Sequence, residues 1–194
     1  SPDVAPIEEF CDGKQNIVFL GRLERRKGLR YLLKAYQQVK QEIPESRLVV
    51  VGLGDRPRKQ HERWIRQNEL QDVVFVGYAS EELKPRYYRT ADVFCAPNTG
   101  HESFGIVLVE AMTMGTPIVA SNIEGYASVL THGEEGLLVP PKNVGELAQA
   151  LITLLKDKSL RQQMGAKGRV TAEQYGWESI AQKIFDHYVR VLKG

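Results

Sequence analysis

Short apolar runs recur along the chain and are bounded by polar or turn-forming residues. They cover residues 16–20, 47–51, 73–76, 93–96, 118–120 and 136–139. None alternates between apolar and polar side chains, as a strand with one solvent-exposed face would. Strands of a parallel sheet show this pattern because helices cover both faces of the sheet. The runs therefore predict buried parallel strands.

Between these runs, apolar residues recur every three or four positions, which is the period of an amphipathic helix. The first such segment covers residues 29–42 and is followed by Pro44, which cannot continue a helix. Further helices are expected over 61–68, 81–89, 106–114, 144–155, 159–169 and 177–192. Strands that alternate with helices predict a doubly wound, Rossmann-like α/β fold, in which ligands bind at the carboxyl ends of the strands.

One sheet and its covering helices account for residues 16–175. Residues 1–15 are interpreted as a linker from an N-terminal domain that the sequence does not include. The helix expected within 176–194 exceeds what one sheet needs, so Trp177 and Tyr188 are expected to pack toward that missing domain.

The charge balance indicates no polyanionic partner. The 194 residues include 26 Lys and Arg against 24 Asp and Glu, and no long basic stripe is interleaved with aromatic residues, so nucleic acid is not expected to bind. Cys11 and Cys95 lie far apart and His61 lacks a second histidine one helical turn away, so neither a disulfide framework nor a metal site is expected. These features, with no apolar run near the ~20 residues of a membrane span, favour a cytoplasmic location.

A glycine-flanked loop, residues 21–28, follows the first strand and carries four cations: Arg22, Arg25, Arg26 and Lys27. Glycine allows close backbone approach to a ligand. Arginine offers a planar fork for phosphate oxygens, and lysine a compact charge. The loop therefore favours a phosphate site, with a solvated basic loop as the alternative. It is not a P-loop, because no Gly-Lys-Ser/Thr follows.

Residues 98–105 follow the fourth strand and lead into an apolar helix. A helix that begins near Phe104 would direct its free N–H groups and the positive end of its dipole into the strand-end cleft, where they favour a diphosphate. Ser103 is expected to cap this helix. Glu102 is expected to face the same cleft, although a carboxylate at a helix entry can equally serve only the dipole.

Glu110 lies within that helix, which is apolar on nearly every side. A buried carboxylate without a partner costs several kcal/mol, so Glu110 requires one. A vicinal diol is one candidate, since a carboxylate accepts from both hydroxyls through charged hydrogen bonds of roughly 1.5–3 kcal/mol each. A salt bridge to Arg22 or another cation is the other candidate, and the residues alone leave both open.

Glycine turns also follow the second and third strands. Residues 52–55 begin like a dinucleotide fingerprint, but Pro57 replaces its last glycine, so a tight turn is favoured. The backbone around Gly77 could border a nucleobase. His101 could donate to a sugar or phosphate. Neither a Gly-x-Ser-x-Gly elbow nor an Asp-x-Asp pair occurs.

In their order along the chain, these motifs resemble the C-terminal domain of retaining GT-B glycosyltransferases (glycosyltransferase group 1, family 4). The resemblance rests on Gly-Arg-Leu followed by Lys27-Gly28, Ala-Asp-Val at 91–93, Glu102 and Glu110 with seven residues between them, and Gly-Thr-Pro-Ile-Val-Ala at 115–120. It extends from about residue 16 to the C-terminus. The stretch 98–112 is most similar to phosphatidylinositol α-mannosyltransferases, which use GDP-mannose.

The resemblance implies roles for four charged side chains. Arg22 and Lys27 match the cations that bind the donor diphosphate and stabilise it as a leaving group. Glu102 matches the glutamate that contacts the hydroxyls of the donor sugar, and Glu110 matches the one that holds the ribose diol.

It also implies that Gly105, Ile106 and Val107 form the helix start whose N–H groups reach the phosphates. The family often has Gly-Gly and then glutamate in the loop after residue 120, where this chain has Glu124-Gly125-Tyr126. The role of that loop is left open.

The implied reaction is departure of a nucleoside diphosphate from the anomeric carbon with retained configuration, without a metal or cofactor. The acceptor, favoured as a phosphatidylinositol-like membrane lipid, would bind the missing N-terminal domain. This chain alone is then expected to bind donor but to transfer little sugar, and the full-length protein could lie on the inner membrane face. The alternatives are a nucleotide-sugar epimerase of the same fold and a non-catalytic nucleotide-binding module.

Overall fold

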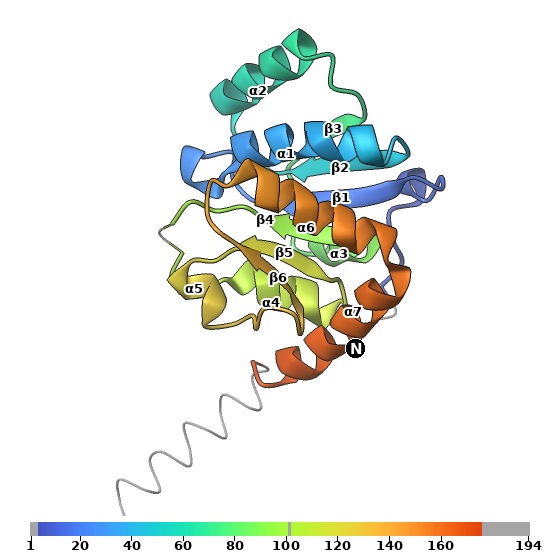
Figure 1. Ribbon diagram of the computed structural model, residues 1–194, viewed down its shortest axis with the longest axis vertical. Helices are drawn as coiled ribbons and strands as arrows, with labels where there is room; N and C mark the ends of the chain where they lie inside the picture. The colour runs from blue at the N-terminus through green and yellow to red at the C-terminus, as the bar shows by residue number, and fades with distance from the viewer. Residues whose placement is uncertain (1–3, 101, 176–194) are drawn as a thin grey trace, which may run out of the picture.

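The computed structural model describes residues 4–100 and 102–175 of the chain. Within them, six parallel strands form one sheet in the order β3-β2-β1-β4-β5-β6 (Figure 1). The strands are β1 (Gln15–Leu20), β2 (Ser46–Val51), β3 (Val73–Gly77), β4 (Val93–Ala96), β5 (Ile118–Ser121) and β6 (Gly136–Val139). This doubly wound order confirms the predicted fold class.

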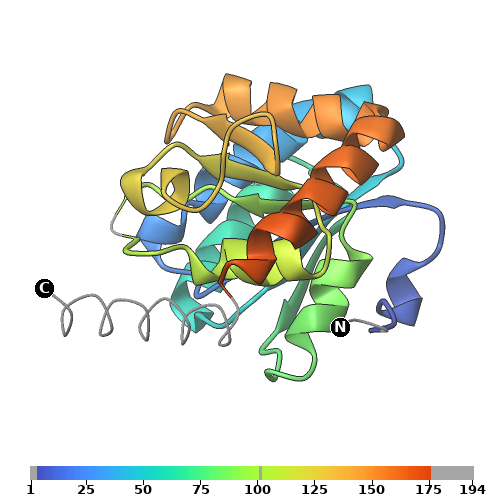
Figure 2. The same cartoon turned by 90° about the horizontal axis from the view of Figure 1, so that it is seen from below.

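Helices cover both faces of the sheet (Figure 2). The helices are α1 (Leu29–Glu42), α2 (Asp55–Gln67), α3 (Lys84–Thr90), α4 (Ile106–Thr113), α5 (Glu124–Ala127), α6 (Val144–Lys156) and α7 (Lys158–Glu173), with 3₁₀ turns η1 (Glu8–Phe10) and η2 (Arg25–Lys27). Helices α1 and α6 share one apolar core with the sheet, whereas α3, α4 and α5 share the other. Helix α7 contributes Met164 to the first core and Ala172 to the second.

The chain reverses its direction of sheet growth between β1 and β4. From β1 it adds strands toward β3, and from β4 it adds strands toward β6. Doubly wound sheets bind ligands at the carboxyl ends of their strands near such a reversal. The sequence places its charged motifs at this edge of the sheet.

Two helices begin in a different place from the prediction. Helix α2 starts at Asp55 rather than at residue 61, with Pro57 in its first turn, and α3 starts at Lys84 with Pro85 in its first turn. Proline is compatible with a first turn because the N–H that it lacks would have no intrahelical acceptor there. The prolines thus mark helix starts.

The beginning of α4 matches the expected range 106–114, but its cap does not match the prediction. The helix starts at Ile106, its N-cap is Gly105 with φ 73°, and no side chain caps it, so the predicted Ser103 cap is wrong. The short helix α5 was not predicted, because four residues cannot show a helical period.

The segment before β1 packs on the domain from residue 5 onward. The Ile7 N–H donates to Thr90 Oγ1 at 2.8 Å, Phe10 is buried, and Asn16 Nδ2 donates to the Phe10 carbonyl at 2.9 Å. Arg86 on α3 donates to the carbonyl of Ala5. The role of residues 1–15 as a linker stays a prediction. The helix predicted within 176–194 lies outside the described residues.

Candidate functional site

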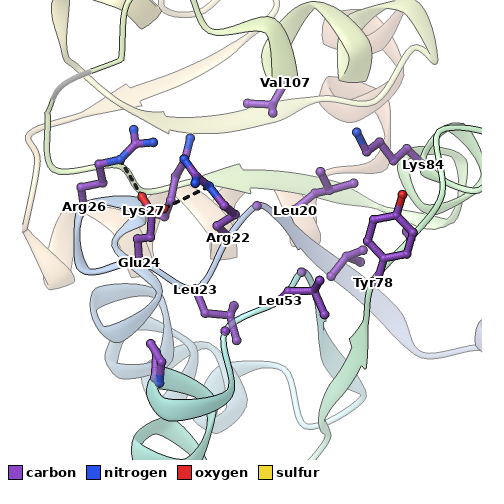
Figure 3. Close-up of a pocket in the computed structure, with 16 residues that line it drawn as sticks. Leu20, Arg22, Leu23, Glu24, Arg26, Lys27, Leu53, Tyr78, Lys84 and Val107 are labelled. Atoms are coloured by element: carbon purple, nitrogen blue, oxygen red, sulfur yellow. Dashed lines mark hydrogen bonds and ion pairs between the residues drawn. The ribbon is translucent and has the colours of Figure 1, made fainter.

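A cleft of about 670 Å³ opens at the carboxyl ends of β1, β2 and β3 (Figure 3). The loop after β1 forms one wall, α3 and the residues after β3 form the opposite wall, and α4 closes one side through Val107. Its principal side chains are Arg22, Lys27, Leu53, Tyr78, Lys84 and Val107. The predicted convergence of the basic loop and the α4 start on one pocket is therefore observed for Arg22, Lys27 and Val107.

Close backbone contacts fix the loops around this cleft. A Cβ on Gly28, whose φ is +76°, would lie 1.8 Å from the carbonyl oxygen of Pro97. The Thr99 N–H donates to the Arg26 carbonyl at 2.8 Å. The loop after β1 is thus joined to the loop after β4, and each carries half of the charge cluster below.

Lys27, Glu102 and Asn98 form that charge cluster. Lys27 Nζ lies 2.7 Å from Glu102 Oε2, and Asn98 Nδ2 donates to the same oxygen at 2.8 Å. Asn98 is buried, and the side chains of Lys27 and Glu102 are only 13% and 21% exposed. Two donors therefore fix one carboxylate oxygen beside the cleft, and Arg26 Nη1 lies 3.8 Å from the same oxygen.

Arg22 stands at the mouth of the cleft. Its side chain is 71% exposed, and its Nε lies 3.0 Å from Glu24 Oε1. Glu24 Oε2 lies 2.8 Å from Arg26 Nε, so one carboxylate bridges two guanidinium groups (Figure 3). This carboxylate offsets only part of the positive charge that Arg22, Arg26, Lys27 and Lys84 bring to the cleft.

The start of α4 reaches this cleft through Val107. Gly105 is the N-cap, and the amides of Ile106 and Val107, at the first two helical positions, have no acceptor within the helix. Val107 lines the cleft, and the Ile106 side chain is 63% exposed. A Cβ on Gly105 would lie 2.8 Å from Tyr126 Cδ1, so packing as well as its left-handed backbone requires glycine here.

Glu110 lies in a separate, smaller cavity of about 200 Å³, which Lys84 lines together with the main cleft. Glu110 Oε2 accepts a hydrogen bond from the Tyr88 hydroxyl at 2.7 Å. Burial and the charge of Glu110 raise the pKa of Tyr88 well above its usual value, so Tyr88 stays a donor at physiological pH. The partner of Glu110 is therefore a tyrosine, not Arg22, and the carboxylate remains at a cavity.

The Lys84 side chain is positioned between both cavities by carboxylates. Its ammonium is paired with Glu81, and this hydrogen bond raises the pKa of Lys84, with a smaller contribution from the charge of Glu110. Lys84 is thus a permanent cation in the wall opposite Lys27 (Figure 3).

The other predicted residues lie nearby without lining the main cleft. Gly77 ends β3 with φ +79°, and its carbonyl accepts a hydrogen bond from the Gly52 N–H. The next two residues, Tyr78 and Ala79, line the cleft. Gly105 and Ile106 line neither cavity, and Glu102 reaches the cleft through Lys27. His101 lies outside the described residues.

Among the residues that hold the site, the prediction missed Lys84 and Tyr88, and it included Asn98 in the loop 98–105 without giving it a role. Asn98 stands two residues after β4, a position typical of ligand or support residues in this fold. Lys84 and Tyr88 are four residues apart on α3 and so share a helix face. That spacing was the available signal for both.

Within residues 4–100 and 102–175, no group of three or more histidine, cysteine or acidic residues could hold a metal ion. No helix in the same residues has the length and apolar character needed to cross a membrane. Cys11 is exposed and Cys95 is buried, and both are free thiols.

Comparison with known proteins shows extensive similarity to one group of sequences. The chain is 40% identical over 192 residues to the phosphatidyl-myo-inositol mannosyltransferase of Mycobacterium tuberculosis (strain CDC 1551 / Oshkosh), covering 96% of this chain and 50% of that protein. It is 39% identical over 178 residues to the phosphatidyl-myo-inositol mannosyltransferase of Mycobacterium leprae (strain TN), covering 91% of this chain and 47% of that protein. The chain thus spans about half the length of the curated relatives it matches.

Solved structures share the fold. Sucrose-phosphate synthase from Thermosynechococcus elongatus superimposes with a TM-score of 0.84 at 30% identity, over 97% of this chain and 50% of that one. Anabaena Alr3699/HepE in complex with UDP and glucose superimposes with a TM-score of 0.83 at 26% identity, over 91% of this chain and 48% of that one. The family model for glycosyl transferases group 1 matches residues 4–171. The chain therefore belongs to the glycosyl transferases group 1 family.

Proposed function

We propose that this chain is the donor-binding half of a retaining glycosyltransferase that moves mannose from GDP-mannose to a lipid or glycan acceptor, with a phosphatidylinositol-like lipid favoured. The observation that carries the proposal is the convergence of Lys27, Arg22 and the start of α4 on one strand-end cleft. Cations and unpaired helix amides at one place form a site for a diphosphate.

The diphosphate would lie between Lys27 and the first turn of α4. The ammonium group of Lys27 has three N–H donors, and one of them donates to Glu102. Arg22 at the mouth adds a second cation. These charges are held before the reaction begins, so they stabilise the charge that develops on the leaving phosphate without reorganising.

Glu102 would contact the sugar. Lys27 and Asn98 hold its Oε2, so the orientation of the carboxylate is fixed and Oε1 can accept from a sugar hydroxyl. Hydrogen bonds from sugar hydroxyls to a carboxylate are stronger than those to a neutral acceptor.

The reaction would break the bond between the anomeric carbon and the diphosphate oxygen and form one from the acceptor oxygen to the same face of that carbon. The acceptor proton would pass to the leaving phosphate. No described side chain at the cleft is placed as a nucleophile, so the acceptor oxygen would attack the anomeric carbon directly. The acceptor would be held by the remaining half of the protein, which fits the half-length match to the curated relatives.

The choice of donor is tested by calorimetric titration with GDP, UDP and ADP and with their mannose and glucose conjugates. We expect GDP to bind at least about tenfold tighter than UDP or ADP, a difference of ~1.4 kcal/mol, and GDP-mannose to bind tighter than GDP-glucose. The preference for guanine is supported by the 40% identity to mannosyltransferases, against 26% to the protein solved with UDP. Equal or tighter UDP binding would overturn the base assignment, and failure of every nucleotide to bind would overturn the donor site.

Transfer is tested with the full-length protein, radiolabelled GDP-mannose and membrane lipid. A labelled lipid product is expected. A labelled sugar isomer still attached to nucleotide would identify an epimerase, and nucleotide binding with neither product would identify a non-catalytic module.

The ribose role of Glu110 predicts sensitivity to the sugar hydroxyls of the nucleotide. Wild-type chain should bind GDP about tenfold tighter than 2′,3′-dideoxy-GDP, because the carboxylate forms charged hydrogen bonds worth roughly 1.5–3 kcal/mol each. Glu110→Gln should lose most of this difference in affinity between GDP and the dideoxy nucleotide. The control variant Glu82→Gln changes an exposed glutamate and should keep the difference. Equal discrimination in all three proteins, measured by calorimetry, would assign Glu110 a structural role only.

A further inference from the structure

A third cavity, of about 370 Å³, lies at the amino ends of the strands, opposite the cleft. It forms where the residues before β4 and those before β5 meet α7. All strands run parallel, so this cavity lies at their amino ends, and the four residues of β4 separate the two edges by roughly 13 Å at ~3.3 Å per residue. It is therefore distinct from the donor cleft.

Cations dominate the wall of this cavity. Arg89, Lys158 and Arg169 line it, and none of them forms an ion pair with a described carboxylate. A fourth cation, Arg161, is neutralised by Asp92, whose Oδ1 lies 3.3 Å from its Nη2. The cavity thus carries three positive charges that the described protein does not balance.

Two of these cations are held close together. Arg89 Nη1 and Arg169 Nη2 both donate to the Met114 carbonyl oxygen, at 3.2 Å and 3.4 Å. The two nitrogens are therefore no more than about 6.6 Å apart, the sum of these distances. One carbonyl at a helix end supplies only part of a negative charge, so repulsion between the two guanidinium groups remains, and an anion between them would relieve it.

We propose that this cavity is a second anion site and that it binds a phosphoryl group independently of the donor cleft. Guanidinium groups match pairs of phosphate oxygens, and Lys158 adds a point charge from the start of α7. Glycine at position 115 leaves room for the Arg169 guanidinium in the wall of the cavity, because a Cβ there would lie 2.3 Å from Arg169 Nε. The alternative is that both arginines only cap the end of α4.

Spectra of the ¹⁵N-labelled chain titrated with inorganic phosphate distinguish these possibilities. The titration uses Lys27→Ala protein, to remove the phosphate site of the cleft, at constant ionic strength, and follows the amides of Gly115 and Gly165 in the cavity wall. We expect saturable shifts at both amides. Shifts that do not saturate, or that occur only at the cleft, would overturn the proposal.

Substitutions test which side chains bind. Arg89→Gln and Arg169→Gln should each weaken phosphate binding about fivefold or more, through loss of a charge-assisted bond, whereas Arg63→Gln, at an exposed arginine on α2, should not. Lys158→Gln should weaken phosphate binding as well. The Met114 carbonyl accepts from Arg89 and Arg169 and not from Lys158, so this variant still tests the proposal if the arginine variants fail to fold. Unchanged affinity in Lys158→Gln and in the folded arginine variants would leave only the capping role.

The source of the phosphoryl group is resolved by vesicle sedimentation. Retention on phosphatidylcholine vesicles that contain phosphatidic acid, lost in the Arg89→Gln/Arg169→Gln double variant, would indicate a lipid phosphate. Binding of inorganic phosphate and glycerol 3-phosphate without retention would indicate a soluble phosphate monoester. Equal retention of wild type and double variant would overturn the lipid source.

Discussion

Lys27→Ala is expected to weaken GDP binding by this chain about tenfold or more, because it removes a charged hydrogen bond to the diphosphate worth roughly 1.5–3 kcal/mol. The Lys27 side chain is 13% exposed, so solvent screens its charge weakly. Arg22→Ala should have a smaller effect, since the Arg22 side chain is 71% exposed and shares its charge with Glu24. Isothermal titration calorimetry with GDP measures both effects.

Lys34→Ala is the matched control. Lys34 is exposed on α1, and its substitution removes the same charge as Lys27→Ala. This variant therefore measures the contribution of net charge to nucleotide binding. GDP affinity should fall in Lys27→Ala and stay within about twofold in Lys34→Ala, as expected for an exposed charge that does not line the cleft and is screened by salt. Equal losses in both variants would show that the effect is long-range, and no loss in Lys27→Ala would remove the phosphate role.

The contact between Lys27 and Glu102 adds a second test to this prediction. In Lys27→Ala, Glu102 keeps the Asn98 bond and the Arg26 guanidinium at 3.8 Å but loses its nearest cation, so its negative charge beside the diphosphate is less compensated. Glu102→Gln in that background should therefore recover part of the lost GDP affinity, and the two substitutions should not be additive. Additive losses would show that the two residues act on the nucleotide separately.

The strands were the part of the fold that the sequence predicted best. β4 and β6 match the expected runs at both ends, because residues buried on both faces of a parallel sheet must be apolar throughout. Helix α2 was harder to place. None of its residues is fully buried, so its apolar period is weak and its start at Asp55 was missed.

The candidate site shows a similar division between local and long-range information. The cations at 21–28 and the acidic residue at 102 could be recognised because strand ends in this fold meet at one edge. The pairing of Lys27 with Glu102 joins residues 75 positions apart, and that of Tyr88 with Glu110 joins residues 22 apart. Local pattern and propensity do not contain such pairs, so the partner of Glu110 was left open between a diol and a cation.

Gly28→Ala is expected to destabilise the domain by about 2–6 kcal/mol. A left-handed backbone costs about 1–3 kcal/mol for a non-glycine residue, and overlap in a packed site costs about 1–3 kcal/mol more. Both apply, since Gly28 has φ +76° and its Cβ would lie 1.8 Å from the Pro97 carbonyl oxygen. At roughly 2–4 °C per kcal/mol for a domain of this size, the thermal midpoint measured by calorimetry should fall by about 5–20 °C.

Gly13→Ala separates the two causes. Gly13 has φ +93°, but a Cβ there would have no neighbour within 4 Å, so only the backbone term applies and the loss should be the smaller one. Because Gly28 joins the loop of Lys27 to the loop of Asn98 and Glu102, Gly28→Ala should also weaken GDP binding in the protein that remains folded, whereas Gly13→Ala should leave it unchanged. Equal destabilisation by both substitutions would show that the loops after β1 and β4 do not meet at Gly28, and the Lys27–Glu102 pair would then lose its structural basis.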